Sequence, residues 1–95
     1  MFTITASGNL GKNPAVKNIG DEKVVCTFPV AVKKNGKTTW VTVEHWGKVA
    51  LSHAEHIKCG DKVLVTGTPK MSAWIDADGT AQNRLTIIAD SVEYC

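Results

Sequence analysis

The run from Thr38 to Gly47 alternates in the manner of a β-strand, and this alternation constrains the fold more than any other feature of the chain. Successive side chains of a strand point to opposite faces, so one face of the run carries Val41, Val43 and His45. The opposite face carries two large rings and a carboxylate among its four side chains: Trp40, Thr42, Glu44 and Trp46. Because an unpaired buried carboxylate is very costly, we expect the valine face to point into the core and both tryptophans to face solvent.

Two more segments in the first half of the chain alternate in the same way. Phe2–Leu10 and Lys23–Lys33 are predicted to be strands, whereas Gly11–Gly20 is expected to form a loop. The Asn-Gly pair within Lys34–Lys37 accepts the positive φ angles of a tight turn. It therefore predicts a hairpin between Lys23–Lys33 and the strand that contains Trp40.

The spacing of apolar residues changes in the second half of the chain, from the two-residue alternation of a strand to the spacing of a helix and back. Apolar residues at helical spacing predict one short helix over Lys48–Lys58, after which Asp61–Lys70, Met71–Ile75 and Arg84–Val92 return to strand character. An antiparallel sheet of this size hides its edges by closing into a barrel. We therefore predict one all-β domain over residues 1–95, a five-stranded barrel of the oligonucleotide/oligosaccharide-binding (OB) fold with one short helix between strands 3 and 4.

Two segments of the predicted strands, Val63–Val65 and Leu85–Ile88, are apolar on both faces. One face must pack in the core, and the other is expected to meet the helix or another subunit. A domain of this size also buries only about 60–65% of its unfolded surface. These features predict self-association, without distinguishing a dimer from a tetramer.

The exposed tryptophans suggest a surface on which nucleobases stack, an interaction worth roughly 1–3 kcal/mol per base. Trp40 and Trp46 would instead be core or interface residues if a strand bulge reversed the two faces. For Trp74, the alternative is a cap on one end of the barrel.

Positive charge is concentrated in the first half of the chain. Residues 1–43 carry six lysines against two acidic residues, whereas residues 44–95 carry five basic against seven acidic residues. Lysines that face phosphates release counterions and make binding salt-dependent. The alternative is that these cations only solubilise the surface. The candidate phosphate contacts are three hairpin lysines and four further cations: Lys33, Lys34, Lys37, Lys12, Lys48, Lys70 and Arg84.

The sequence predicts neither an enzyme nor a metal or cofactor site. Cys26, Cys59 and Cys95 lack the C-x-x-C spacing of a zinc site, and His53 and His56 have no evident third ligand. The chain also lacks a nucleophile motif and a phosphate-binding glycine signature. Without a leader or an apolar run of about 20 residues, we expect a soluble cytoplasmic protein with no membrane association.

Five short motifs occur in the order and spacing found in bacterial single-stranded DNA-binding proteins: SGNLGKNP (7–14), TWV (39–41), WGK (46–48), KCGDKV (58–63) and WIDADG (74–79). The chain therefore resembles that family over roughly residues 3–92. The resemblance implies an OB barrel, a homotetramer or homodimer, that coats single strands in replication, repair and recombination. Family members usually carry a flexible acidic tail, whereas this sequence ends at Tyr94-Cys95. We therefore expect a single domain without that tail, either in a tail-less relative or in a shortened chain.

Together these observations predict a nucleoid-associated protein that binds single-stranded DNA with little sequence preference. Bases would stack on Trp40, Trp46 and Trp74, and cations would contact phosphates. One alternative is a replication-restart accessory protein similar to primosomal replication protein B, which acts through replication or restart proteins as well as DNA. Another is an interaction module whose tryptophans meet a protein or RNA surface.

Overall fold

The alternating segments of the chain form one six-stranded sheet. The structure is a computed structural model, and it describes residues 2–20, 23–47 and 56–94. Its elements are all strands: β1 (Ile4–Leu10), β2 (Ala15–Asn18), β3 (Val24–Lys34), β4 (Lys37–Trp46), β5 (Lys62–Ile75) and β6 (Ala81–Tyr94).

Five of the strands close into a barrel. The sheet runs in the order β1-β5-β6-β4-β3-β2, and an additional pairing between β1 and β3 joins its two sides. The β4–β6 pairing is parallel and the other pairings are antiparallel. This arrangement confirms the predicted OB-fold barrel, and β2 extends the sheet beyond the closed ring as a partner of β3.

Barrel closure requires β1 to approach β3 closely. A side chain at Gly8 would place its Cβ 2.9 Å from Val30 Cγ1 and closer still to the carbonyl oxygen of Ala31. Glycine is therefore needed where the two strands meet, just before the paired residues Asn9 and Leu10.

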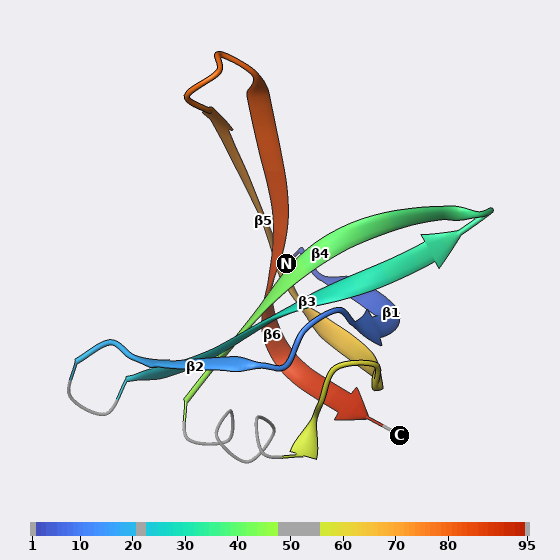
Figure 1. The fold of residues 1–95 in the computed structure, drawn as a ribbon. Coiled ribbons are helices and arrows are strands. Elements are labelled where there is room, and N and C mark those ends of the chain that lie inside the picture. The colour runs from blue at the N-terminus through green and yellow to red at the C-terminus, as the bar shows by residue number, and fades with distance from the viewer. Residues whose placement is uncertain (1, 21–22, 48–55, 95) are drawn as a thin grey trace.

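Two long hairpins extend beyond the barrel as arms (Figure 1). The β3–β4 arm ends at Asn35 and Gly36, whose φ angles of 53° and 77° fit the tight turn predicted from the sequence. The β5–β6 arm ends at the turn that follows Ile75. β5 continues as one strand through Gly67, with a register shift between Thr66 and Gly67.

The structure differs from the sequence-based prediction between β1 and β3, and it does not describe most of the predicted helix. The loop expected over Gly11–Gly20 was wrong in part, because Ala15–Asn18 forms β2 and pairs with β3. All four residues of β2 are exposed, so no alternation in hydrophobicity signalled this strand. The helix predicted over Lys48–Lys58 falls mainly on residues 48–55, outside the described residues, and the described elements do not confirm it.

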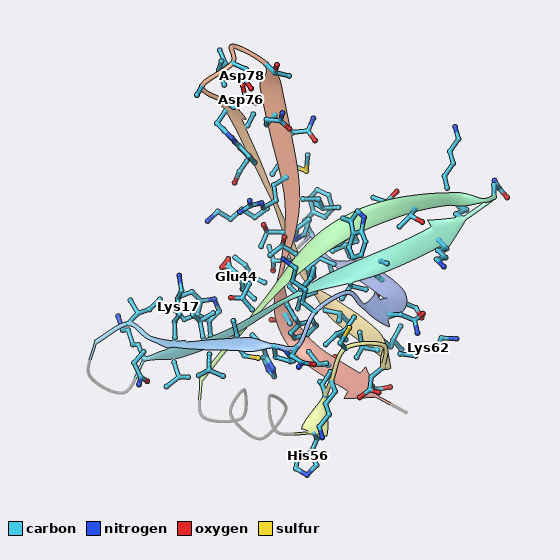
Figure 2. All side chains as sticks on the ribbon, in the orientation of Figure 1. Lys17, Glu44, His56, Lys62, Asp76 and Asp78 are labelled. Atoms are coloured by element: carbon cyan, nitrogen blue, oxygen red, sulfur yellow. The ribbon has the colours of Figure 1, made fainter. Side chains whose placement is uncertain are left out.

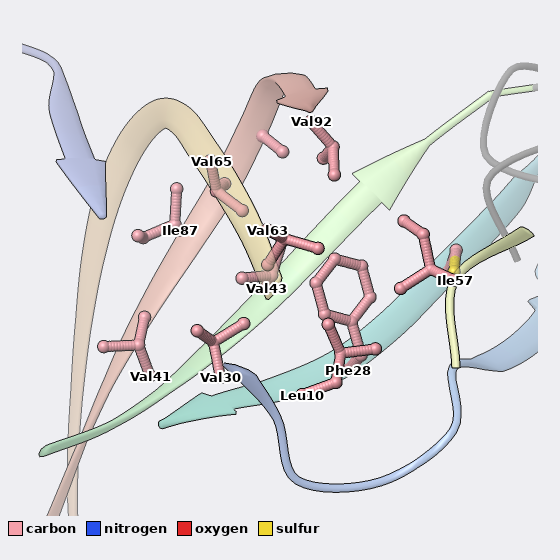
Figure 3. Packing of buried hydrophobic residues seen from close by; sticks show 12 residues of the cluster. Leu10, Phe28, Val30, Val41, Val43, Ile57, Val63, Val65, Ile87 and Val92 are labelled. Atoms are coloured by element: carbon pink, nitrogen blue, oxygen red, sulfur yellow. The ribbon is translucent and has the colours of Figure 1, made fainter. Parts of the chain in front are cut away.

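Buried residues that alternate along much of β3, β4 and β5 pack into a shared core, part of which Figure 3 shows. Its fully buried side chains come from four strands and from the segment before β5: Phe28, Ile57, Ile87, Val30, Val43, Val63, Val65 and Cys26. Burial raises the pKa of the Cys26 thiol, which fits its predicted role as a small apolar residue. Within the described part of the chain, no helix is long and apolar enough to cross a bilayer.

Removal of a large core side chain should lower the free energy of unfolding. Phe28 is 0% exposed, so Phe28→Ala should leave a cavity and lower the free energy of unfolding by about 3–5 kcal/mol. Phe2→Ala is the matched control, since Phe2 is 74% exposed and should contribute little. Urea denaturation of both variants measures the difference, and equal losses would contradict the assignment of Phe28 to the core.

Candidate functional site

The solvent side of β4 carries the two tryptophans that the sequence predicted to be exposed. Trp40 is 59% exposed and Trp46 is 43% exposed, whereas Val41 and Val43 are buried in the core. The faces of β4 are therefore confirmed as predicted. We call the solvent side of β4, together with the residues in register with it on neighbouring strands, the outer face.

The outer face continues from β4 onto β6 and β5. Thr42 lies beside Thr86 in the parallel β4–β6 pairing. Trp40 and Arg84 each precede this pair by two positions, so they share its face, and both line the two grooves described next. Arg84 lies in turn opposite Ser72 of β5.

Two adjoining grooves cross this surface. The loop groove has a volume of about 590 Å³, and its lining includes Gly11, Lys12, Lys17, Pro29, Trp40 and Arg84. The arm groove has a volume of about 530 Å³ between the two arms, and its lining includes Trp40, Met71, Trp74, Gln82, Asn83 and Arg84. Both grooves share Trp40, Thr42 and Arg84, so they meet at these residues.

The indole of Trp74 is held by a cation. The guanidinium carbon of Arg84 lies over the ring, 5.2 Å from its centroid. Such cation–π contacts are worth about 0.5–1 kcal/mol at exposed sites. Trp74 remains 42% exposed, so the contact orients the ring and leaves part of it open to the arm groove.

Four of the predicted site residues line the grooves: Trp40, Trp74, Lys12 and Arg84. Five other predicted residues are exposed elsewhere on the described surface, on β3, β4, β5 and the tip of the β3–β4 arm: Trp46, Lys33, Lys34, Lys37 and Lys70. Lys48 lies outside the described residues.

Sequence reasoning missed Lys17 and Gln82. Lys17 lines the loop groove from β2, where it lies opposite Val25. Because β2 was expected to be a loop, no face was assigned to this lysine. Gln82 lies opposite Trp74 and lines the arm groove. Recognition of β2 would have revealed Lys17, whereas the role of Gln82 depends on the register of the β5–β6 arm.

Asp76 organises the turn at the tip of the β5–β6 arm (Figure 2). Its Oδ1 accepts hydrogen bonds from the backbone N–H groups of Asp78 and Thr80, both at 3.0 Å. Its Oδ2 accepts one from Nε2 of Gln82 at 3.1 Å. These hydrogen bonds lower the pKa of Asp76, and the one from the Thr80 backbone has the largest effect. The carboxylate thus connects the turn to a side chain of the arm groove.

The side chains that line the two grooves are not typical metal ligands. Within the described residues, no three His, Cys, Asp or Glu side chains gather as a metal site would require. The grooves instead combine aromatic rings, cations and amides, which suit an extended polar ligand with flat groups.

The chain is similar in sequence to one protein family and to several of its members. The chain matches the family model described as "Single-strand binding protein family" over residues 1–95. It is 30% identical over 92 residues to Single-stranded DNA-binding protein 1 of Synechocystis sp., covering 90% of this chain and 76% of that relative. Single-stranded DNA-binding protein 1 of Nostoc sp. is 33% identical over 86 residues, which cover 87% of this chain and 71% of that relative. Single-stranded DNA-binding protein 1 of Clostridium acetobutylicum is 28% identical over 104 residues, which cover 99% of this chain and 93% of that relative.

The Asp76 turn predicts a pH-dependent contribution to stability. Because folding lowers the pKa of Asp76 below the ordinary 3.8, its contribution is full above that value and is lost as the pH falls through the folded-state pKa. Asp76→Ala should therefore lower the melting temperature at pH 7, and the difference from the wild type should shrink below pH 3.8. Asp78→Ala controls for the loss of one carboxylate from the same turn. A difference that stays constant from pH 7 to pH 3 would contradict this assignment.

Proposed function

The chain belongs to the single-strand binding protein family, and we propose that it binds single-stranded DNA along the loop groove and the arm groove. The observation that carries this proposal is the exposure of Trp40 and Trp74 on adjoining grooves that also contain cations. The names of the relatives support the same class of ligand.

Bases would stack on the two groove tryptophans, while cations would contact the backbone of the strand. Every base has a flat π face, so stacking tolerates any sequence. Lys12, Lys17 and Arg84 line the loop groove and would neutralise phosphates. A single OB barrel of this kind accommodates about 4–16 nucleotides.

The predicted residues outside the grooves would extend this contact surface. Trp46 shares the outer face of β4 with Trp40, and Lys70 lies on β5 opposite Thr86. Lysines on and beside the β3–β4 arm would attract the strand electrostatically as it leaves the grooves. These contacts remain proposals, as does a contact from Lys48.

In the cell, the proposed role is to coat and protect single strands during replication, recombination and repair, as a binding protein rather than an enzyme. The family match and the relatives' names favour this role and give no support to the restart-accessory alternative. An interaction module for RNA or protein would use the same exposed rings, so the choice of nucleic acid must be measured directly.

A titration of the intrinsic tryptophan fluorescence with oligo-dT at two salt concentrations tests the proposal. We expect quenching at low salt and weaker binding at higher salt, because binding releases counterions from the phosphates. Duplex DNA should bind much more weakly, since its bases are already stacked. No quenching at low salt, or equal affinity for duplex, would overturn the proposal. Competition with a matched RNA tests the RNA-binding alternative.

Loss of either groove ring should weaken binding without unfolding the protein. Trp40→Ala and Trp74→Ala are each expected to cost about 1–3 kcal/mol of binding free energy, or roughly 5- to 150-fold in affinity. The melting temperature should change little, because both side chains are substantially exposed. Fluorescence anisotropy of labelled oligo-dT measures the affinity, with Phe2→Ala as an aromatic control away from the grooves. Unchanged affinity in both tryptophan variants would argue against stacking.

We also propose that the chain self-associates as a homotetramer or homodimer, as is typical of the family. Leu64 is 40% exposed on β5, whereas its neighbours Val63 and Val65 are buried in the core. Its burial between subunits would remove apolar surface from water. Light scattering should give a mass above that of one chain, and Leu64→Lys should lower it. A monomer at high micromolar concentration would contradict self-association.

A further inference from the structure

The β1–β2 loop is bonded to two distant parts of the chain. On one side, the N–H of Gly11 donates to the carbonyl oxygen of Pro29 at 3.0 Å. On the other side, the N–H of Cys59 donates to Oδ1 of Asn13 at 2.7 Å, and the Cys59 thiol donates to the carbonyl oxygen of Gly11 at 3.4 Å. The N–H of Gly60 also donates to the carbonyl oxygen of Leu10 at 2.9 Å. The loop is thus held between β3 and the segment that precedes β5.

The ring of Trp40 lies directly on this loop. A Cβ at Gly11 would lie 2.7 Å from Cη2 of Trp40 and closer still to Cζ3. Any side chain at this position would displace the indole. The ring therefore packs against the backbone of Gly11, although the two residues belong to different parts of the barrel.

Movement of Gly11 would consequently move the ring. The indole projects from the outer face of β4 and is largely exposed, so contacts with neighbouring segments help to set its orientation. Gly11 lies against the far edge of the ring, where the atoms Cζ3 and Cη2 are found. The position of Gly11 depends on the hydrogen bonds of the loop, among which the Asn13–Cys59 bond is the shortest.

We propose that Asn13 is a positioning residue for the Trp40 stacking surface, acting through Gly11. Asn13 accepts the Cys59 N–H, this bond fixes the loop, and the fixed loop holds the ring in the orientation that a base meets. The inference rests on the proposed function only for its effect on DNA affinity, because the orientation of the ring can be measured without DNA.

The experiment uses the full chain labelled with 5-fluorotryptophan and followed by ¹⁹F NMR. The Trp40 signal is assigned by its loss in Trp40→Phe. Asn13→Ala should shift or broaden this signal and lower the affinity for oligo-dT by roughly 2- to 10-fold, the effect of one lost hydrogen bond. Asn13→Asp keeps the Oδ1 acceptor and should restore the wild-type ¹⁹F signal, although its added charge will itself weaken DNA binding.

Asn9→Ala is the matched control. The Nδ2 of Asn9 donates to the carbonyl oxygen of Gly60 at 3.0 Å, so this variant loses a comparable bond to the same segment and leaves the Asn13–Cys59 bond in place. A merely structural role for Asn13 predicts that Asn9→Ala and Asn13→Ala change stability and the Trp40 signal in the same way. The proposal predicts that only Asn13→Ala moves the Trp40 signal.

Two results would overturn the proposal: an unchanged Trp40 signal in Asn13→Ala, or an equal change in Asn9→Ala. If Asn13→Ala does not fold, Asn13→Ser replaces it. The serine side chain is too short to reach the N–H of Cys59 but retains a polar group in the loop. If the wild-type protein fails to bind oligo-dT, the proposed function fails, and the ¹⁹F comparison still decides whether Asn13 orients the ring.

Discussion

Closure of the barrel is the constraint on which the rest of the structure depends. β1 pairs with β5 and β3, and the short β1–β3 pairing of Asn9 with Ala31 and of Leu10 with Val30 joins the two sides of the sheet. Gly8 permits the close approach of these strands. Closure gives this small domain an interior that receives alternate residues from every barrel strand. It also carries the β1–β2 loop to the outer face, where the candidate site lies.

The site forms where this loop, the sheet and the β5–β6 arm meet, and its two rings are held by different interactions. The Trp40 indole rests on the backbone of Gly11, whereas the Trp74 indole is covered in part by the guanidinium of Arg84. A ring that is already oriented loses less freedom when a ligand binds. The surroundings therefore pre-organise both rings while leaving them exposed, and the cations that line the loop groove lie within the same surface.

Much of the fold was predictable because alternation in a strand identifies its buried face directly. The strand containing Trp40 was oriented correctly for this reason, and the turn at Asn35 and Gly36 was evident from its chemistry. β2 was missed because all its residues are exposed, and it is a strand because β3 has an edge with which it can pair. The same error concealed Lys17. Lys33 and other predicted cations near the β3–β4 arm lie outside the described linings of the grooves, and their contacts with DNA stay predictions.

The sequence by itself determined which side chains of β4 face the core and which face solvent, because burying the unpaired carboxylate of Glu44 would be very costly. Only the tertiary structure decided which exposed residues meet. Arg84 reaches Trp74, and Trp40 reaches Gly11, through strand register and barrel closure. Register is a property of paired strands rather than of any one segment, so no local pattern in the chain could specify these contacts.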